Sequence, residues 1–258
     1  MDGNADLAEP AGCRTYLFAS TQHGAGSLPV TDRRPTGERA RYGINTVDYT
    51  PLLRSALANL DAWVSEGREP PPSQYPRLDD GTAVAPATAL ATLAATGAIA
   101  LPDYVPAWRR VDWGESAAKG IASVIPPRMG AEYPHFVSAV DADGNETAGI
   151  RLPDVSVPLA THISWNLRHP DIGASGEFLD LTGSTVPFAA TRAERFARGD
   201  KRRSIEERYA SKGDYLAHVR AAAIGLAGAG YLLREDVEGV VAGAGERWDA
   251  FAALAGVK

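Results

Sequence analysis

A short β-prone segment that ends in a glycine-rich turn sets the strongest limit on the fold of this chain. Residues 14–20, RTYLFAS, have the aromatic and branched side chains typical of a buried strand. The sequence TQHGAG follows directly at residues 21–26, and glycines right after a strand indicate a tight turn at its carboxyl end. In open α/β sheets, binding and catalytic sites are built at this edge. The pattern therefore predicts a strand at residues 14–20 and places His23 beside a candidate site.

A helix is predicted over residues 52–64. Thr50 can cap it, Pro51 suits its first position, and Gly67 can end it. The spacing of its apolar residues predicts one buried face, made of Leu53, Ala56, Leu57, Leu60 and Val64. A strand, a turn and a helix form one α/β layer. Because a lone strand leaves both edges unpaired, we expect an α/β protein in which this layer joins a larger sheet.

The middle of the chain is predicted to extend beyond that layer. The proline-rich residues 69–76 indicate a stiff connector, and residues 79–130 indicate an irregular segment that packs over the rest. Asp-Gly within residues 141–145 predicts the turn of a hairpin between strands at residues 136–140 and 147–152. We therefore expect a hydrolase-like core in residues 1–76 and a covering extension in residues 77–258.

The last third is predicted to be helical. Thr191, Ser204 and Ser211 each precede a carboxylate by three residues, the pattern that starts helices. A final amphipathic helix is indicated by one apolar face, made of Val237, Val240, Val241, Ala244, Trp248, Phe251 and Ala252.

Charge and cysteine content exclude several classes of function. The net charge of −6 argues against a nucleic-acid partner, which would require a surplus of Lys and Arg. The basic residues 201–203 are flanked by carboxylates, which favours the solvated start of a helix over a phosphate contact. The single cysteine, Cys13, cannot form an internal disulfide and is expected to be a buried, inert thiol. We expect no cofactor.

The sequence shows no membrane or export signal. Residues 1–12 are small and polar, so that Ala11-Gly12-Cys13 matches the end of a lipoprotein signal only by chance. The longest apolar window, residues 82–101, is interrupted by Pro86. As the sequence stands, we expect a soluble, cytoplasmic chain without a membrane partner.

His23 is the strongest candidate for a catalytic residue. A general base needs one ring nitrogen free for the nucleophile and the other oriented by a carboxylate, at the mouth of a site. A histidine on a glycine-flanked turn after a strand meets the positional requirement. The alternative is a loop histidine that bonds only locally.

Several longer stretches resemble a known family. They are YLFASTQHG at 16–24, RYGINTVDY at 41–49, VDADGNE at 140–146, GIRLPDV at 149–155, WNLR at 165–168, DLTGS at 180–184 and PFAATRAER at 187–195. With the helix at 52–64, they resemble the C-terminal portion of a large bacterial family of uncharacterised α/β-hydrolase-domain proteins. The resemblance implies the last strand, histidine turn and helix of a hydrolase sheet, followed by a mixed hairpin and helical extension. It also implies that His23 is the general base of a triad that hydrolyses a small-molecule ester.

One part of the hydrolase pattern is missing. These enzymes carry nucleophile, acid and histidine in that order, with the serine in G-x-S-x-G. Residues 114–118 (GESAA) and 173–177 (GASGE) both lack the final glycine. We therefore expect the chain to be a fragment of a serine-type hydrolase that is inactive without an upstream N-terminal segment, either continuous with it or separately encoded. A relic, or a non-enzymatic interaction module built on a hydrolase remnant, is the alternative. The resemblance extends to exported proteins, so the location of the complete protein stays open.

Other candidate sites are weaker. Ser184 is expected to be a turn serine and not a displaced nucleophile. Trp165 and Asn166 could line a pocket, although a core tryptophan beside a capping amide is the simpler interpretation. The spacing of His135, His162 and His169 matches no metal site, and residues 141–145 lack the glycine and glutamate positions of a calcium loop. We therefore expect no bound metal.

Overall fold

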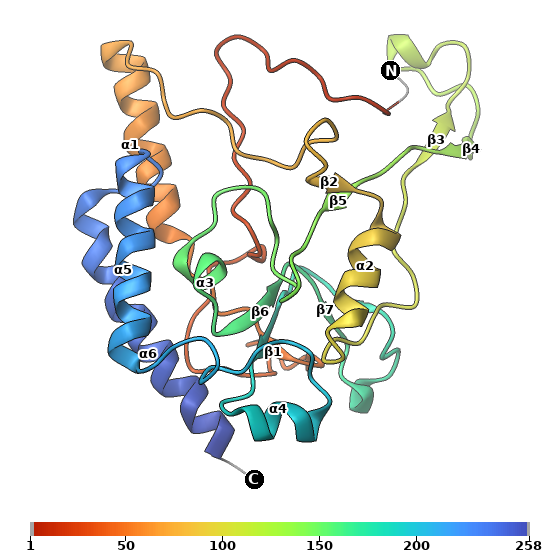
Figure 1. Ribbon diagram of the computed structural model, residues 1–258. Coiled ribbons are helices and arrows are strands. Elements are labelled where there is room, and N and C mark those ends of the chain that lie inside the picture. Colours follow the sequence, from red (N-terminus) through yellow and green to blue (C-terminus); the bar gives the residue numbers. More distant parts are fainter. Residues whose placement is uncertain (1–2, 257–258) are drawn as a thin grey trace.

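The computed structural model describes residues 3–256 and has helices around small sheets (Figure 1). Three helices lie together on one side: α1 (Thr50–Glu66), α5 (Lys212–Gly228) and α6 (Val237–Gly256). On the opposite side lies α2 (Pro86–Ala95), and a three-stranded sheet lies between.

The three-stranded sheet is antiparallel and joins distant parts of the sequence. Its strand order is β1 (Gly43–Ile44), β9 (Ser184–Pro187), β6 (Ala160–Ile163). Ser184 of the central strand β9 pairs with Ile44 of β1 on one side and with Ile163 of β6 on the other. Because β1 belongs to residues 1–76 and β6 and β9 to residues 77–258, the two predicted regions share this sheet. The domain division itself stays a prediction.

The remaining strands form two-stranded ladders, all of them antiparallel. In sequence order the pairs are β2 (Ala83–Val84) with β5 (Val137–Ser138), β3 (Arg109–Asp112) with β4 (Arg128–Glu132), and β7 (Asn166–Leu167) with β8 (Phe178–Leu179). Residues 3–256 therefore combine helices with strands, as an α/β protein does, and the strands form small antiparallel sheets.

Residues 14–20 do not form the predicted buried strand. They make isolated parallel bridges, Tyr16 with Gln74 and Phe18 with Ile150. Only Ala19 and Ser20 in this segment are buried. Prolines on both sides of Gln74 lack the N–H donors of a longer ladder, which explains why pairing stops after one bridge.

Helix α1 ends as predicted, but Thr50 is its first residue and not its cap, Tyr49 precedes it without a capping side-chain bond, and the opposite face is buried. It ends at Gly67, whose φ of 70° is the left-handed value that favours glycine. Leu57 and Val64 are 68% and 81% exposed, so the apolar stripe faces outward. The buried face uses Leu52, Ser55 and Ala62 instead. Small side chains let the helix approach the turn after α5, where the Ser55 hydroxyl donates to the carbonyl of Gly230 (3.1 Å).

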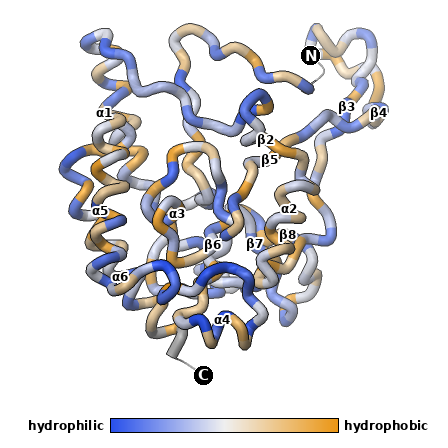
Figure 2. Tube along the Cα trace, in the orientation of Figure 1, coloured by the Kyte–Doolittle hydropathy of each residue, from blue (hydrophilic) through white to orange (hydrophobic). Residues whose placement is uncertain are grey.

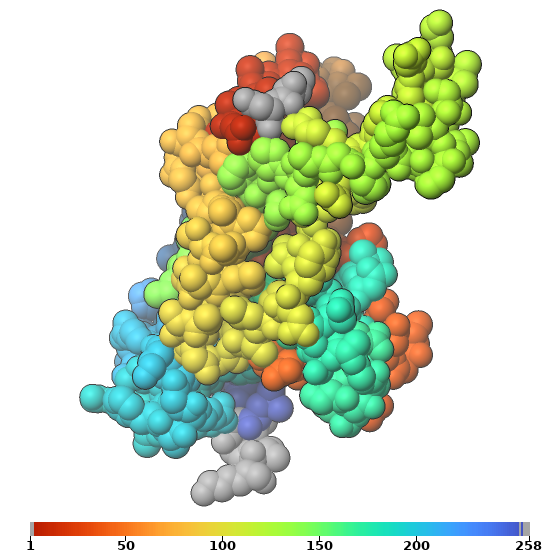
Figure 3. All heavy atoms as spheres, turned by 90° about the vertical axis from the view of Figure 1, so that its right-hand side faces the viewer, coloured from red at the N-terminus to blue at the C-terminus, as the bar shows by residue number. Residues whose placement is uncertain are grey.

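The segment predicted to be an irregular cover contains regular structure. Helix α2 buries Ala89 and Leu93, whereas β3 and β4 form a hairpin that projects from the body (Figure 3). Every residue of both strands is exposed. Trp108 and Ile125 in this hairpin are 84% and 78% exposed. Figure 2 shows hydrophilic and hydrophobic stretches alternating along it. The prediction of an irregular segment was wrong for these strands. A loop of fifteen residues, 113–127, separates β3 from β4, so no short turn sequence signals their pairing.

The turn at residues 141–145 forms as predicted, but its hairpin is short. The amide of Asp141 donates to the carbonyl of Asn145 (2.8 Å), and Val140 bridges Glu146. The second predicted strand then diverges, because Ile150 bridges Phe18 instead of continuing the ladder. The short helix α3 (Pro153–Ser156) follows.

Two of the three predicted helix starts are confirmed. Thr191 caps α4 (Arg192–Arg198) and Ser211 caps α5, each accepting a hydrogen bond from an amide three residues on. Ser204 is different, because its amide and hydroxyl both donate to Glu207 and only a turn forms. The predicted face of α6 is buried or half-buried except for Ala252, which is exposed, and it packs on α5 around Tyr215, Val219, Val241, Ala244 and Phe251.

The basic residues 201–203 are not the solvated start of a helix. Arg202 is buried and makes two hydrogen bonds to Asp200, at 3.0 and 2.6 Å. Its guanidinium also donates to the hydroxyl of Thr161 (2.7 Å) and lies 5.0 Å from the ring centre of Phe188. Arg202 therefore belongs to the core, whereas Lys201 and Arg203 on either side of it are exposed.

No helix within residues 3–256 is both long enough and apolar enough to cross a membrane.

Candidate functional site

His23 lies on an exposed turn directly after residues 14–20. Its backbone carbonyl accepts a hydrogen bond from the Tyr49 hydroxyl (2.6 Å). Its ring makes no hydrogen bond or ion pair with any residue that the structure describes, so both nitrogens remain available to a substrate or a further protein segment.

The backbone before His23 is held in a strained conformation. Ser20 is completely buried with φ of 57°, a value unusual for a residue with a side chain. Its amide donates to Oε2 of Glu146 (2.5 Å), and its hydroxyl accepts from the amide of Glu146 (2.9 Å). The side-chain amide of Asn45 donates to the Ser20 carbonyl (2.8 Å). These bonds stabilise a backbone shape that the residue alone would avoid.

The backbone on both sides of His23 is anchored as well. The side-chain oxygen of Gln22 accepts from the amide of Gly183 (2.8 Å), and the amide of Gly26 donates to the carbonyl of Val47 (2.8 Å). A Cβ at Gly26 would lie 2.3 Å from the backbone of Thr46, so only glycine allows this approach. A functional histidine requires such a rigid support.

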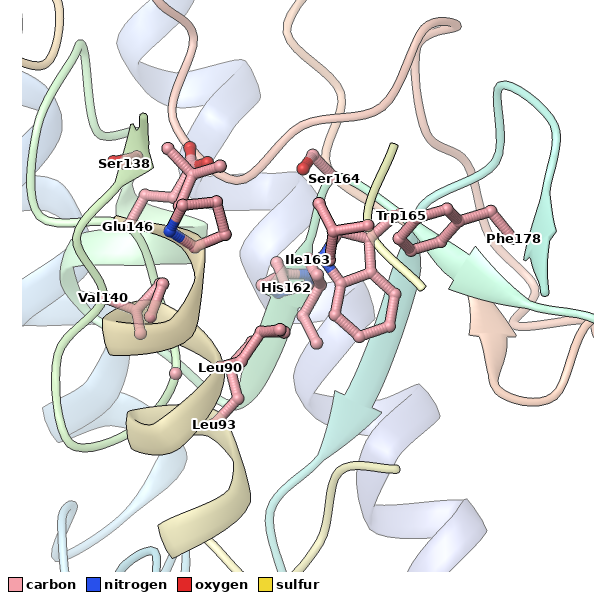
Figure 4. A pocket seen from close by; sticks show the side chains of 15 residues that line it. Leu90, Leu93, Ser138, Val140, Glu146, His162, Ile163, Ser164, Trp165 and Phe178 are labelled. Atoms are coloured by element: carbon pink, nitrogen blue, oxygen red, sulfur yellow. The ribbon is translucent and has the colours of Figure 1, made fainter. Parts of the chain in front are cut away.

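A pocket lies between α2 and the end of β6, with a volume of about 120 Å³ (Figure 4). Apolar residues supply most of its lining: Pro86, Ala89, Leu90, Leu93, Val105, Val137, Val140, Ile163, Trp165 and Phe178. Its polar side chains are Ser138, Glu146, His162 and Ser164. An apolar pocket with a few converging polar groups is the usual form of a small-molecule site.

Glu146 connects the pocket to the histidine turn. It lines the pocket and also holds Ser20. Burial raises the pKa of this carboxyl, and the hydrogen bond from the Ser20 amide opposes that shift. The sequence analysis missed Glu146, because it contacts Ser20 across 126 residues and no local pattern signals that contact.

The histidines considered as metal ligands have separate environments. His162 is buried on β6, with Nδ1 3.1 Å from the Thr185 hydroxyl, and burial lowers its pKa to about 3. Nδ1 of His169 accepts from the amide of Asp171 (3.1 Å), and His135 precedes β5. Among the described residues, no three His, Cys, Asp or Glu side chains are grouped closely enough to hold a metal ion.

Trp165 and Asn166 have different roles. Trp165 lines the pocket, with its ring in edge contact with Phe178 (centroids 5.5 Å apart). Asn166 is buried, and its side chain bonds backbone groups of Tyr42 and Gly183. Only the tryptophan is therefore placed to contact a ligand.

Neither Ser184 nor Cys13 lines the pocket. Ser184 is a buried strand residue at the start of β9, not a turn serine, and its hydroxyl donates to the Trp165 carbonyl (2.6 Å). Cys13 is exposed, contrary to the prediction of a buried thiol. Its position in the extended N-terminal segment, which packs on residues 69–79, leaves it outside the core.

The comparisons with known proteins support the sequence resemblance. No curated protein and no solved structure matches the chain significantly. A family model described as an alpha/beta hydrolase domain matches residues 2–242. The match covers nearly all of the sequence and includes both the His23 turn and the pocket. The chain therefore belongs to the alpha/beta hydrolase domain family.

Proposed function

We propose that His23 is the general base in the serine-type hydrolysis of an ester or related acyl bond. The observation that carries this proposal is the contrast between the backbone and side chain of His23. The Tyr49 hydroxyl donates to the His23 carbonyl, and Asn45 and Glu146 hold Ser20 just before the turn, while the ring stays exposed and unengaged. Membership of the hydrolase family supports the same role.

The remaining catalytic groups would come from elsewhere in the complete enzyme. His23 would take the proton of a serine hydroxyl as its oxygen attacks the acyl carbon, then return it to the leaving alcohol. Water would hydrolyse the acyl-enzyme by the same proton transfers. G-x-S-x-G is absent from the sequence, so we propose that an N-terminal hydrolase segment outside residues 1–258 supplies the serine, the acid and the oxyanion donors.

The test measures hydrolysis of p-nitrophenyl acetate by the 258-residue chain and by the longest natural polypeptide that contains it. We expect the longer protein to hydrolyse the ester and the 258-residue chain to show no turnover. His23→Asn should lower its kcat by about 1,000-fold or more, as expected for loss of a triad base. His218→Asn is the matched control, because His218 is also exposed but lies on α5. Unchanged turnover in the His23 variant, or turnover by the short chain that depends on one of its own serines, would refute the proposal.

A non-enzymatic interaction module is the second candidate, favoured by the projecting hairpin. Trp108 and Ile125 on this hairpin are exposed although both are strongly apolar. Surfaces of this kind mark interaction sites. If the module interpretation holds, the complete protein has no esterase turnover, and replacing both residues by serine weakens self-association in sedimentation equilibrium without changing the free energy of unfolding.

A further inference from the structure

The pocket between α2 and β6 has an apolar interior with aromatic side chains at one end. Leu90 and Leu93 of α2 and Ile163 of β6 contribute to its apolar lining. Trp165 and Phe178 meet edge to face, with ring planes at 62°. The volume of about 120 Å³ approaches that of an engineered apolar cavity of about 150 Å³ that binds benzene. One ring or a branched aliphatic group therefore matches its size.

Glu146 gives this pocket a single carboxyl with no basic side chain beside it. No Lys or Arg is among the lining residues, and Glu146 is the one carboxyl among them. Its Oε2 accepts from the Ser20 amide, whereas Oε1 accepts no hydrogen bond from a described residue. His162 cannot supply the positive charge near neutral pH, because burial keeps its ring neutral. A hydrogen-bond donor therefore complements Oε1, and an ammonium group adds charge complementarity to the ionised carboxylate.

We propose that this pocket binds a small primary amine that carries one aromatic ring or a branched aliphatic group. Its ammonium group pairs with Glu146, and its apolar group packs against Trp165 and Phe178. Figure 4 shows Glu146 and the two aromatic residues on opposite sides of the pocket, which separates the polar end from the apolar end. A carboxylate or phosphate ligand is disfavoured, because Glu146 would repel it and no basic side chain offsets that repulsion.

This assignment does not rest on the role of His23 in hydrolysis. It concerns binding to the 258-residue chain, with no chemical step. A protein without esterase turnover could still bind the amine in this pocket. A protein that does not bind the amine could still use His23 in hydrolysis.

The test compares three ligands of similar shape by isothermal titration calorimetry: benzylamine, benzyl alcohol and benzoate. We expect benzylamine to bind at least about tenfold more tightly than benzyl alcohol, which corresponds to about 1.4 kcal/mol. Benzoate should bind more weakly than both. Equal affinities for the amine and the alcohol, or preferential binding of benzoate, would overturn the proposal.

Two variants locate the interaction. Glu146→Gln should abolish the advantage of benzylamine over benzyl alcohol, whereas Glu246→Gln, a change at an exposed residue of α6, should leave it intact. Leu90→Trp should fill the pocket and abolish binding of both ligands. Retention of the amine preference in Glu146→Gln would refute the assignment.

Because Glu146 also holds Ser20, its replacement could unfold the chain. Circular dichroism checks this for each variant. If Glu146→Gln is unfolded, two other measurements test whether the amine binds in this pocket. They are amine binding by Leu90→Trp and the NMR shift of the indole N–H of Trp165. Benzylamine should shift that resonance in the wild-type chain, and an unshifted resonance or unaltered binding in Leu90→Trp would exclude this pocket.

Discussion

His162 should make the stability of this protein depend on pH in a way that one substitution can isolate. The residue is buried on β6, and burial, assisted by the positive charge of Arg247, lowers its pKa from 6.5 to about 3. Its Nδ1 lies 3.1 Å from the Thr185 hydroxyl, so the neutral ring has a hydrogen-bond partner. The folded protein therefore keeps this ring neutral at pH values where an unfolded chain would protonate it.

The sign and size of the effect follow from the two pKa values. Below pH 6.5 the unfolded state binds a proton at His162 and the folded state does not, so acidification favours unfolding. Each pH unit in this window costs about 1.4 kcal/mol. Between about pH 8 and about pH 5, the His162 contribution should lower the free energy of unfolding by about 2 kcal/mol. This loss continues until the pH approaches about 3.

The assay is urea denaturation of the wild type and of His162→Asn at both pH values. Asparagine keeps a polar atom near the position of Nδ1 but cannot be protonated. Its smaller volume lowers stability by an amount that does not depend on pH. Carboxyls with raised pKa, such as Glu146, influence both proteins alike.

The wild type should therefore lose about 2 kcal/mol relative to the variant between about pH 8 and about pH 5. A difference between the two proteins that stays constant to within about 0.5 kcal/mol would refute the reasoning.

Two further predictions concern packing, and urea denaturation measures both. Leu57→Lys should change the free energy of unfolding by no more than about 0.5 kcal/mol, because Leu57 is exposed. Leu52→Ala should lower it by about 2–5 kcal/mol, because Leu52 is buried. A large loss of stability in Leu57→Lys would show that the outer face of α1 is buried. Gly149→Ala should cost about 3 kcal/mol, because its φ is 84° and a Cβ would lie 2.6 Å from the Leu17 carbonyl. Gly12→Ala, with φ of 75° and open space, should cost only about 1–2 kcal/mol, and equal costs at the two glycines would contradict the predicted clash.

Local patterns in the sequence identified the elements whose ends depend on adjacent residues. Gly67 ends α1 because a left-handed residue is needed there, whatever the helix packs against. Thr191 and Ser211 start helices through bonds to amides three residues away, and the turn at residues 141–145 closes through its own backbone. His23 was located in the same way, from the glycines beside it. His23 lies on an exposed turn whose backbone is anchored, and its catalytic role stays a proposal.

The tertiary structure decided which faces are buried and which groups meet. The apolar stripe of α1 predicted burial, yet the helix meets the neighbouring turn through Ser55 and Asn59, whose side chains both donate to the Gly230 carbonyl. Arg202 was expected in solvent, but Asp200 and Thr161 satisfy its charge and donors inside the core. Such choices depend on contacts between distant residues, which periodicity along the chain does not encode. For the same reason the pocket, and the pairing of Glu146 with Ser20 across 126 residues, exist only once the chain has folded.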